Sequence, residues 1–76
     1  MLKSVAFEVI GEQRLNCEAC EQRVSRLLKT VEGVGQVCAH ADRQRIDVLF
    51  DAAVLDPTSI AARLREAGYE TKVLGQ

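Results

Sequence analysis

The feature that most constrains the fold of this chain is the order in which two kinds of hydrophobic periodicity follow one another. Over residues 3–10 apolar residues alternate with polar ones, which predicts a strand. From Glu18 to about Val31 apolar residues instead recur every three or four positions, which predicts one buried face of a helix. The residues EGVG then end that helix. The apolar sets are Val5, Phe7 and Val9 in the first segment, and Val24, Leu27, Leu28 and Val31 in the second.

The second half of the chain continues with two alternating segments. Apolar residues alternate from Val34 to Ala41 and again from Ile46 to Phe50, which predicts two further strands. The polar residues ADRQ between them predict a turn.

A second helix and a closing strand complete the pattern. Asp56 followed by Pro57 is typical of a helix start, because the carboxylate caps free N–H groups and proline fits the first helical position. Gly68 is typical of a helix end. Ile60, Ala61, Leu64 and Ala67 supply the buried face of this helix, and residues 69–74 predict a short last strand.

The predicted element order, β-α-β-β-α-β, fits a single domain spanning residues 1–76. A chain of this size buries only about 60% of its unfolded surface, so every element must contribute to one core. With right-handed crossovers, both helices cover the same face of the sheet. We therefore expect an α+β, ferredoxin-like sandwich with a four-stranded antiparallel sheet, in which the second strand lies at an edge.

Charge and hydropathy exclude several functional classes. The net charge is −1 with both signs interspersed, which argues against a nucleic-acid partner. No apolar run approaches the ~20 residues of a membrane span, and the first residues lack the pattern of a signal peptide. No catalytic triad, paired catalytic carboxylates or phosphate-binding loop is apparent, so we do not expect an enzyme. We expect a cytoplasmic protein whose three cysteines stay reduced.

Two of these cysteines, Cys17 and Cys20, form a CxxC pair where a polar loop meets the predicted first helix. Thiols at a helix start can converge on one ion, and the free N–H groups there favour thiolates. Soft sulfur ligands select Cu(I) among common biological metals, with Zn(II) and other thiophilic ions also open. Two ligands leave a structural zinc site half empty, whereas they suit an ion that is held briefly and passed on.

The element order and the CxxC pair together resemble the heavy-metal-associated domain of copper chaperones, metal-ATPase N-terminal domains and mercury-binding proteins. The resemblance covers nearly the whole chain, since VEGVGQV is similar to the family's link into the second strand and LREAGYE to its second-helix exit. It implies that Cys17 and Cys20 bind Cu(I), with Zn(II), Hg(II) or another thiophilic ion as alternatives. It also implies transfer to a metal-transporting P-type ATPase or another CxxC domain, without membrane insertion.

The chain departs from the family around the cysteines. The usual Gly-Met-Thr before the first cysteine is replaced by Arg14, Leu15 and Asn16. We expect Leu15 to act as an apolar plug beneath the loop and Asn16 to hydrogen-bond locally. The preceding stretch is also longer than usual, so Gly11 marks either a β-bulge or an enlarged loop.

The resemblance assigns roles to further residues near the cysteines. Tyr69 is expected at the metal-loop end of the sheet, where it either lies near the thiolates or simply fills the core. A polar rim for partner docking is expected from four charged residues: Arg14, Glu18, Glu21 and Arg23.

Three alternative functions use the same residues. A thiol–disulfide redox protein also carries CxxC at a helix start, although the only proline, Pro57, is predicted to begin a helix and does not face the pair. A structural zinc site would need Cys17, Cys20, Cys38 and His40 together. The third alternative is a non-metal regulatory or interaction module of the same fold.

Cys38 and His40 alternate with core positions of the second strand, so we expect them on the sheet face that no helix covers. This placement argues against the four-ligand zinc site. It permits a separate accessory metal site, completed by a second molecule in a metal-promoted homodimer. An exposed strand that simply tolerates a cysteine and a histidine is the alternative.

Overall fold

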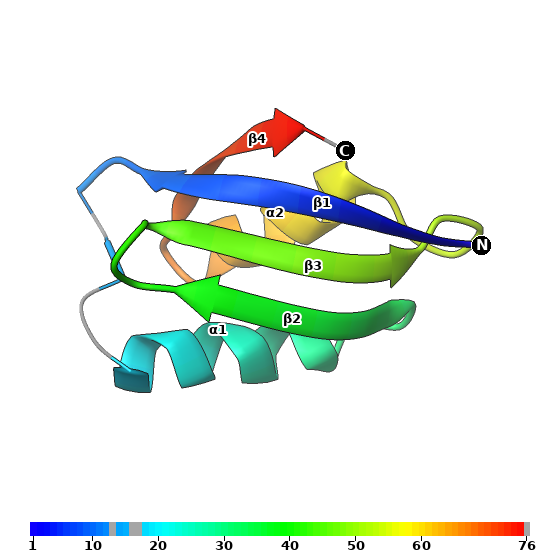
Figure 1. Ribbon diagram of the computed structural model, residues 1–76, viewed down its shortest axis with the longest axis horizontal. Coiled ribbons are helices and arrows are strands. Elements are labelled where there is room, and N and C mark those ends of the chain that lie inside the picture. Colours follow the sequence, from blue (N-terminus) through cyan, green and yellow to red (C-terminus); the bar gives the residue numbers. More distant parts are fainter. Residues whose placement is uncertain (13, 16–17, 76) are drawn as a thin grey trace.

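The computed structural model describes residues 1–12, 14–15 and 18–75. It confirms the predicted element order (Figure 1). The elements are β1 (Leu2–Ile10), α1 (Glu18–Lys29), β2 (Val34–His40), β3 (Arg45–Asp51), α2 (Pro57–Glu66) and β4 (Glu70–Gly75). Helix α1 ends slightly earlier than predicted, because the Val31 amide donates a hydrogen bond to the Leu28 carbonyl, 3.0 Å away, in a tighter turn.

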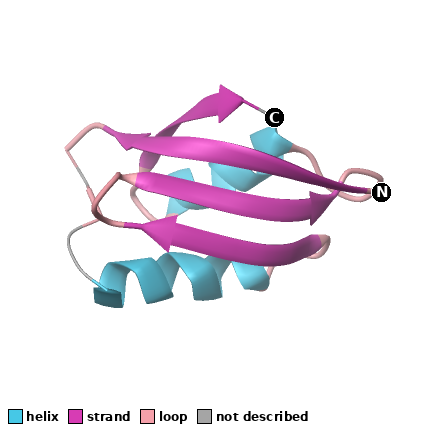
Figure 2. Cartoon of the chain, in the orientation of Figure 1, coloured by secondary structure: helices cyan, strands magenta, loops and turns pink. Residues whose placement is uncertain are grey.

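The four strands form one antiparallel sheet in the order β2-β3-β1-β4. Strands β3 and β1 are therefore central, and β2 lies at an edge as predicted. Helix α1 packs against β2, helix α2 packs against β4, and the two helices contact each other on one face of the sheet (Figures 1 and 2). The expected ferredoxin-like sandwich is confirmed.

The core lies between the helices and the inner face of the two central strands. Each central strand buries alternate residues, and the buried residues pair across the sheet, as Val5 does with Val48 and Phe7 with Ile46. Burial of each such side chain contributes about 1.5–3 kcal/mol. A one-residue slip would turn all of them outward, so this burial fixes the strand register. The central-strand core residues are Val5, Phe7, Val9, Ile46, Val48 and Phe50, and the helices add Val24, Leu28, Ile60 and Leu64.

Helix α2 begins and ends as the sequence predicts. The Asp56 carboxylate accepts a hydrogen bond from the Ser59 amide at 2.8 Å, and Pro57 occupies the first turn. At the other end Gly68 has φ +98°. Its amide donates to the Arg65 carbonyl, and the Tyr69 amide donates to the Leu64 carbonyl, each at 2.9 Å. This paired arrangement closes the helix and turns the chain toward β4.

Gly11 begins the loop after β1. Pairing between β1 and β4 continues through Ile10, and the register irregularity between these strands lies instead at Ala6 and Phe7. Gly11 has φ +84°, and a Cβ atom there would meet a Glu70 carboxylate oxygen at 3.0 Å. Gly11 therefore lies in the loop after β1 and not at the irregularity of the sheet, and an enlargement of that loop relative to the family stays a prediction.

None of the helices in the described part of the chain is long and apolar enough to cross a membrane.

The cap of α2 predicts a pH-dependent stability. The hydrogen bond from the Ser59 amide, followed by one from its hydroxyl, lowers the pKa of Asp56 below its ordinary value of 3.8. Stability from this group is complete above the unfolded pKa and is lost as pH falls through the lower folded pKa. In Asp56→Asn the amide oxygen still caps the helix but carries no charge. We expect its stability deficit in urea unfolding to shrink as pH falls from about 5 to about 2.

A hydrogen bond from the Ala53 amide also lowers the pKa of Asp51. Asp51 is present in both the wild type and Asp56→Asn, so its titration cancels in the difference between their free energies of unfolding. A deficit that stays constant with pH would contradict the charged cap.

Candidate metal site

Cys20 lies in the first turn of α1, which begins at Glu18. Its side chain is half-buried and packs against the hydrophobic core. Cys17 and Asn16 lie outside the described residues, so the pairing of Cys17 with Cys20 stays a prediction. The position of Cys20 agrees with a ligand held at a helix start, where free N–H groups favour a thiolate.

Leu15 is buried, with only 2% of its surface exposed. It belongs to the same core cluster against which Cys20 packs. The predicted burial of Leu15 is therefore confirmed, and its place beneath the cysteine loop stays a prediction. Truncating a buried leucine to alanine costs about 2–5 kcal/mol of folding free energy. The Leu15 side chain therefore anchors the chain just before the cysteines to the core.

The described residues of the loop after β1 are held by hydrogen bonds. The Arg14 guanidinium donates from Nε to the Gly11 carbonyl at 2.9 Å and from Nη1 to the Val9 carbonyl at 3.4 Å. Gln44, in the turn between β2 and β3, accepts a hydrogen bond from the Leu15 amide at 2.8 Å and donates one to the Leu15 carbonyl at 2.6 Å. Sequence reasoning missed Gln44, since these bonds span 29 residues and a polar turn residue carries no local signal of them.

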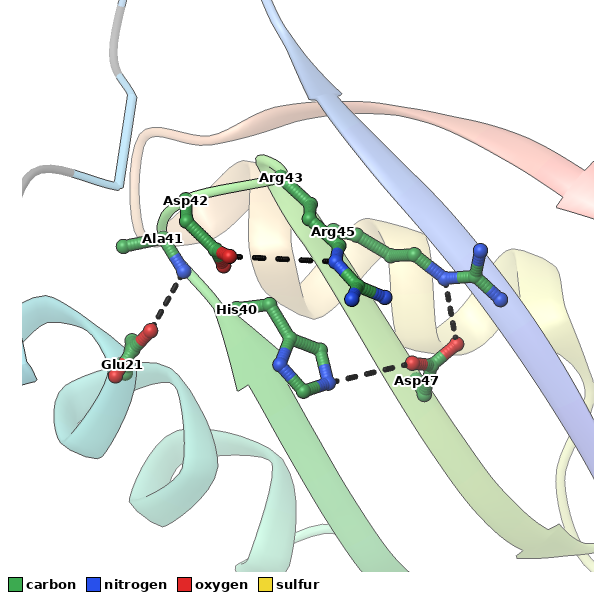
Figure 3. Close-up of polar contacts among 7 residues, drawn as sticks. All are labelled: Glu21, His40, Ala41, Asp42, Arg43, Arg45 and Asp47. Carbon is green, nitrogen blue, oxygen red and sulfur yellow. Dashed lines mark hydrogen bonds and ion pairs between the residues drawn. The ribbon is translucent and has the colours of Figure 1, made fainter.

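Two residues of the predicted docking rim, Glu21 and Arg14, form hydrogen bonds within the fold. The Glu21 carboxylate accepts a hydrogen bond from the Ala41 amide at 2.6 Å (Figure 3), and Arg14 binds the two carbonyls of its own loop. Arg23 is exposed, and the Glu18 side chain lies outside the described part. Arg23 is therefore the rim residue that the structure leaves open to solvent without a described partner.

Tyr69 fills the core near the end of β1, since the next residue, Glu70, pairs with Ile10. It is 1% exposed and belongs to the core cluster. Its hydroxyl is buried and has no hydrogen-bond partner among the described residues. The core-filling role is confirmed, and a role near the thiolates stays a prediction.

Cys38 and His40 lie on edge strand β2, opposite Asp47 and Arg45 of β3. Cys38 is exposed, and His40 Nε2 lies 3.6 Å from a carboxylate oxygen of Asp47. The other Asp47 oxygen accepts a hydrogen bond from Arg45 Nε at 3.0 Å (Figure 3). One of the two histidine nitrogens that can bind a metal thus faces a carboxylate that also binds an arginine.

In residues 1–12, 14–15 and 18–75, no three His, Cys, Asp or Glu residues lie close enough together to hold a metal. Cys20 is therefore not brought together with Cys38 and His40, which argues against the four-ligand zinc alternative. The accessory site in a metal-promoted homodimer stays a prediction.

Comparison with known proteins decides the family. The model of the heavy-metal-associated domain matches residues 13–70, more than half of the chain. The chain belongs to the heavy-metal-associated domain family. Among individual proteins, this heavy-metal-associated domain is similar to the copper chaperone CopZ of Enterococcus hirae. The two are 28% identical, and the match covers 90% of this chain and 94% of CopZ. The predicted family resemblance is confirmed.

Two further similarities define the setting of such domains. The chain is 31% identical to copper-transporting ATPase 1 of Rhizobium meliloti over 90% of its own length, but it spans only 8% of that ATPase. The fold superposes on the crystal structure of oxidized MerP from Ralstonia metallidurans with a TM-score of 0.86 and 27% identity, covering 99% of this chain and all of MerP.

The Tyr69 hydroxyl, which has no hydrogen-bond partner among the described residues, gives a direct stability prediction. A buried hydroxyl without a partner costs about 1–3 kcal/mol of folding free energy, so Tyr69→Phe should raise the free energy of unfolding of the metal-free protein. Tyr69→Leu is the control, because it also removes the ring and should destabilise. Urea unfolding measures both. A loss of stability in Tyr69→Phe would mean that the hydroxyl has a partner in the folded protein.

Proposed function

We propose that this heavy-metal-associated domain binds one soft metal ion, Cu(I), through Cys17 and Cys20 and passes it to the cysteines of a partner protein. The observation that carries the proposal is the position of Cys20, half-buried in the first turn of α1 and packed on the core. The relatives named copper chaperone and copper-transporting ATPase support copper as the cargo.

The chemistry of the loop supports a soft ion. A helix start offers free N–H groups and the positive end of the helix dipole, and both favour thiolate over thiol. The buried Leu15 side chain, two residues before Cys17, adds apolar surroundings. Thiolates prefer Cu(I), and Zn(II) or Hg(II) would compete for the same sulfur atoms.

Transfer follows from the small number of ligands. An ion held by two thiolates remains open to a third, so a partner's cysteine can bind before the first bonds break and no free ion is released. The natural partner is another CxxC domain, such as that of a metal-transporting P-type ATPase. Such exchange requires reduced thiols, which the cytoplasm maintains.

A Cu(I) titration against a competing chelator tests the proposed ligands. The reduced protein should bind one Cu(I) ion, and Cys17→Ser with Cys20→Ser should abolish tight binding while circular dichroism stays that of the folded protein. Cys38→Ser is the matched control, because the exposed Cys38 thiol lies on β2 and should leave the affinity unchanged. Tight binding that survives in the double variant would refute the assignment.

Docking to the partner should depend on the exposed charge of Arg23, which lies in the middle of α1, one turn after Cys20. Charges at the rim of an interface mainly change association rates and their salt dependence. Arg23→Glu should therefore slow copper transfer to a CxxC acceptor and change the salt dependence of the rate. Lys3→Glu makes the same charge change near the start of β1, where Lys3 pairs with Phe50 near the end of β3, and should have little effect. The N-terminus lies at the end of the sheet opposite the start of α1 (Figure 1).

Equal transfer rates for Arg23→Glu and Lys3→Glu at every salt concentration would exclude this docking surface. The metal-binding assignment would be unaffected by that result.

A further inference from the structure

Gln44 has a backbone conformation that needs a compensating interaction. Its φ is +51°, and it is the one non-glycine residue with positive φ in the described part of the chain. The left-handed region costs an ordinary L-residue about 1–2 kcal/mol. A glycine or asparagine would take this position more readily, so the glutamine side chain is the feature to explain.

The Gln44 side chain forms three hydrogen bonds. Its amide oxygen accepts from the Leu15 amide at 2.8 Å, and its amide nitrogen donates to the carbonyls of Leu15 at 2.6 Å and Ala41 at 2.7 Å. Since the two carbonyls require a donor and the amide requires an acceptor, only one orientation of the glutamine amide satisfies all three. The Gln44 carbonyl also accepts from the Val9 amide at 2.7 Å.

Ala41 connects this arrangement to the start of α1. Its carbonyl accepts from the Gln44 side chain, and its amide donates to the Glu21 carboxylate at 2.6 Å (Figure 3). Leu15 is the second residue before Cys17, and Glu21 is the first residue after Cys20. One four-residue turn, residues 41–44, therefore holds the chain on both sides of the CxxC pair.

We propose that Gln44 and Glu21 are positioning residues for the cysteine pair: bonded through the turn at Ala41, they fix the two flanks of the metal loop relative to each other. The inference rests on the proposed function. Two ligands three residues apart in one chain bind an ion well only when their separation is set before binding, because ordering them afterwards subtracts from the affinity. The hydrogen bonds of Gln44 to Leu15 hold the chain just before the cysteines before any ion is bound.

The variants Gln44→Gly and Gln44→Asn distinguish an effect of Gln44 on the position of the metal ligands from an effect on the folding stability of the whole domain. Both variants suit a positive φ, but glycine adds backbone freedom and asparagine does not, so their free energies of unfolding should differ. Neither side chain reaches Leu15, since asparagine is one methylene shorter. Both should therefore bind Cu(I) about tenfold more weakly, by similar factors. Arg43→Ala, in the same turn and exposed, is the matched control and should bind as the wild type does.

Glu21 provides a test by conservative rescue. Glu21→Gln retains an oxygen that accepts from the Ala41 amide and should keep wild-type Cu(I) affinity, whereas Glu21→Ala should bind about tenfold more weakly. If the glutamine and alanine variants are equally weak, the charge matters and the proposed hydrogen bond to Ala41 does not, which would overturn this half of the proposal.

Hydrogen exchange at the Leu15 amide tests the clamp without metal. In the metal-free protein the exchange rate should rise at least tenfold in both Gln44 variants and stay unchanged in Arg43→Ala. Unchanged exchange in the Gln44 variants, or Cu(I) affinities that simply follow the free energies of unfolding, would overturn the proposal. Failure of the wild type to bind Cu(I) would instead refute the proposed function, and the exchange rates would still decide whether Gln44 clamps the loop.

Discussion

The rest of the structure depends on the burial of one face of the two central strands. Because β1 and β3 bury alternate residues against the helices, their register cannot slip without exposing the whole core. Fixed register places the ends of the strands at fixed positions. The loop after β1, the start of α1, the turn between β2 and β3 and the link from α2 to β4 consequently gather at one end of the sheet (Figure 1).

This gathering lets one turn stabilise a loop that has little regular structure of its own. The Gln44 side chain binds Leu15 and Ala41, and Ala41 in turn binds Glu21. Net contributions of about 0.5–1.5 kcal/mol per hydrogen bond are small against the burial of the core, but they act where two thiols must be held together. The sheet thus supplies most of the stability, and the turn supplies the local order that a metal loop requires.

The fold was predictable from the sequence because its determinants are local. Alternation, helical periodicity, the Asp56 cap and the Gly68 stop each act over a few residues, and all the elements that they predict are observed. The exceptions lie at helix ends: α1 ends earlier than expected, and Ala67, expected on the buried face of α2, is exposed at its C-cap. The burial of Leu15 was predictable from its place in the loop and its apolar side chain.

The support of the site was not predictable in the same way. The bonds of Gln44 to Leu15 span 29 residues, and that of Glu21 to Ala41 spans 20, so both depend on the completed sheet. The sequence pattern therefore assigned Glu21 to docking, whereas its carboxylate is hydrogen-bonded within the fold.

X-ray absorption at the copper edge of the Cu(I)-loaded, reduced protein distinguishes sulfur ligands from nitrogen ligands. We expect sulfur ligands from Cys17 and Cys20 alone, in a spectrum unchanged by Cys38→Ser with His40→Ala. A histidine nitrogen ligand, or a spectrum altered by that double variant, would refute binding by the CxxC pair alone.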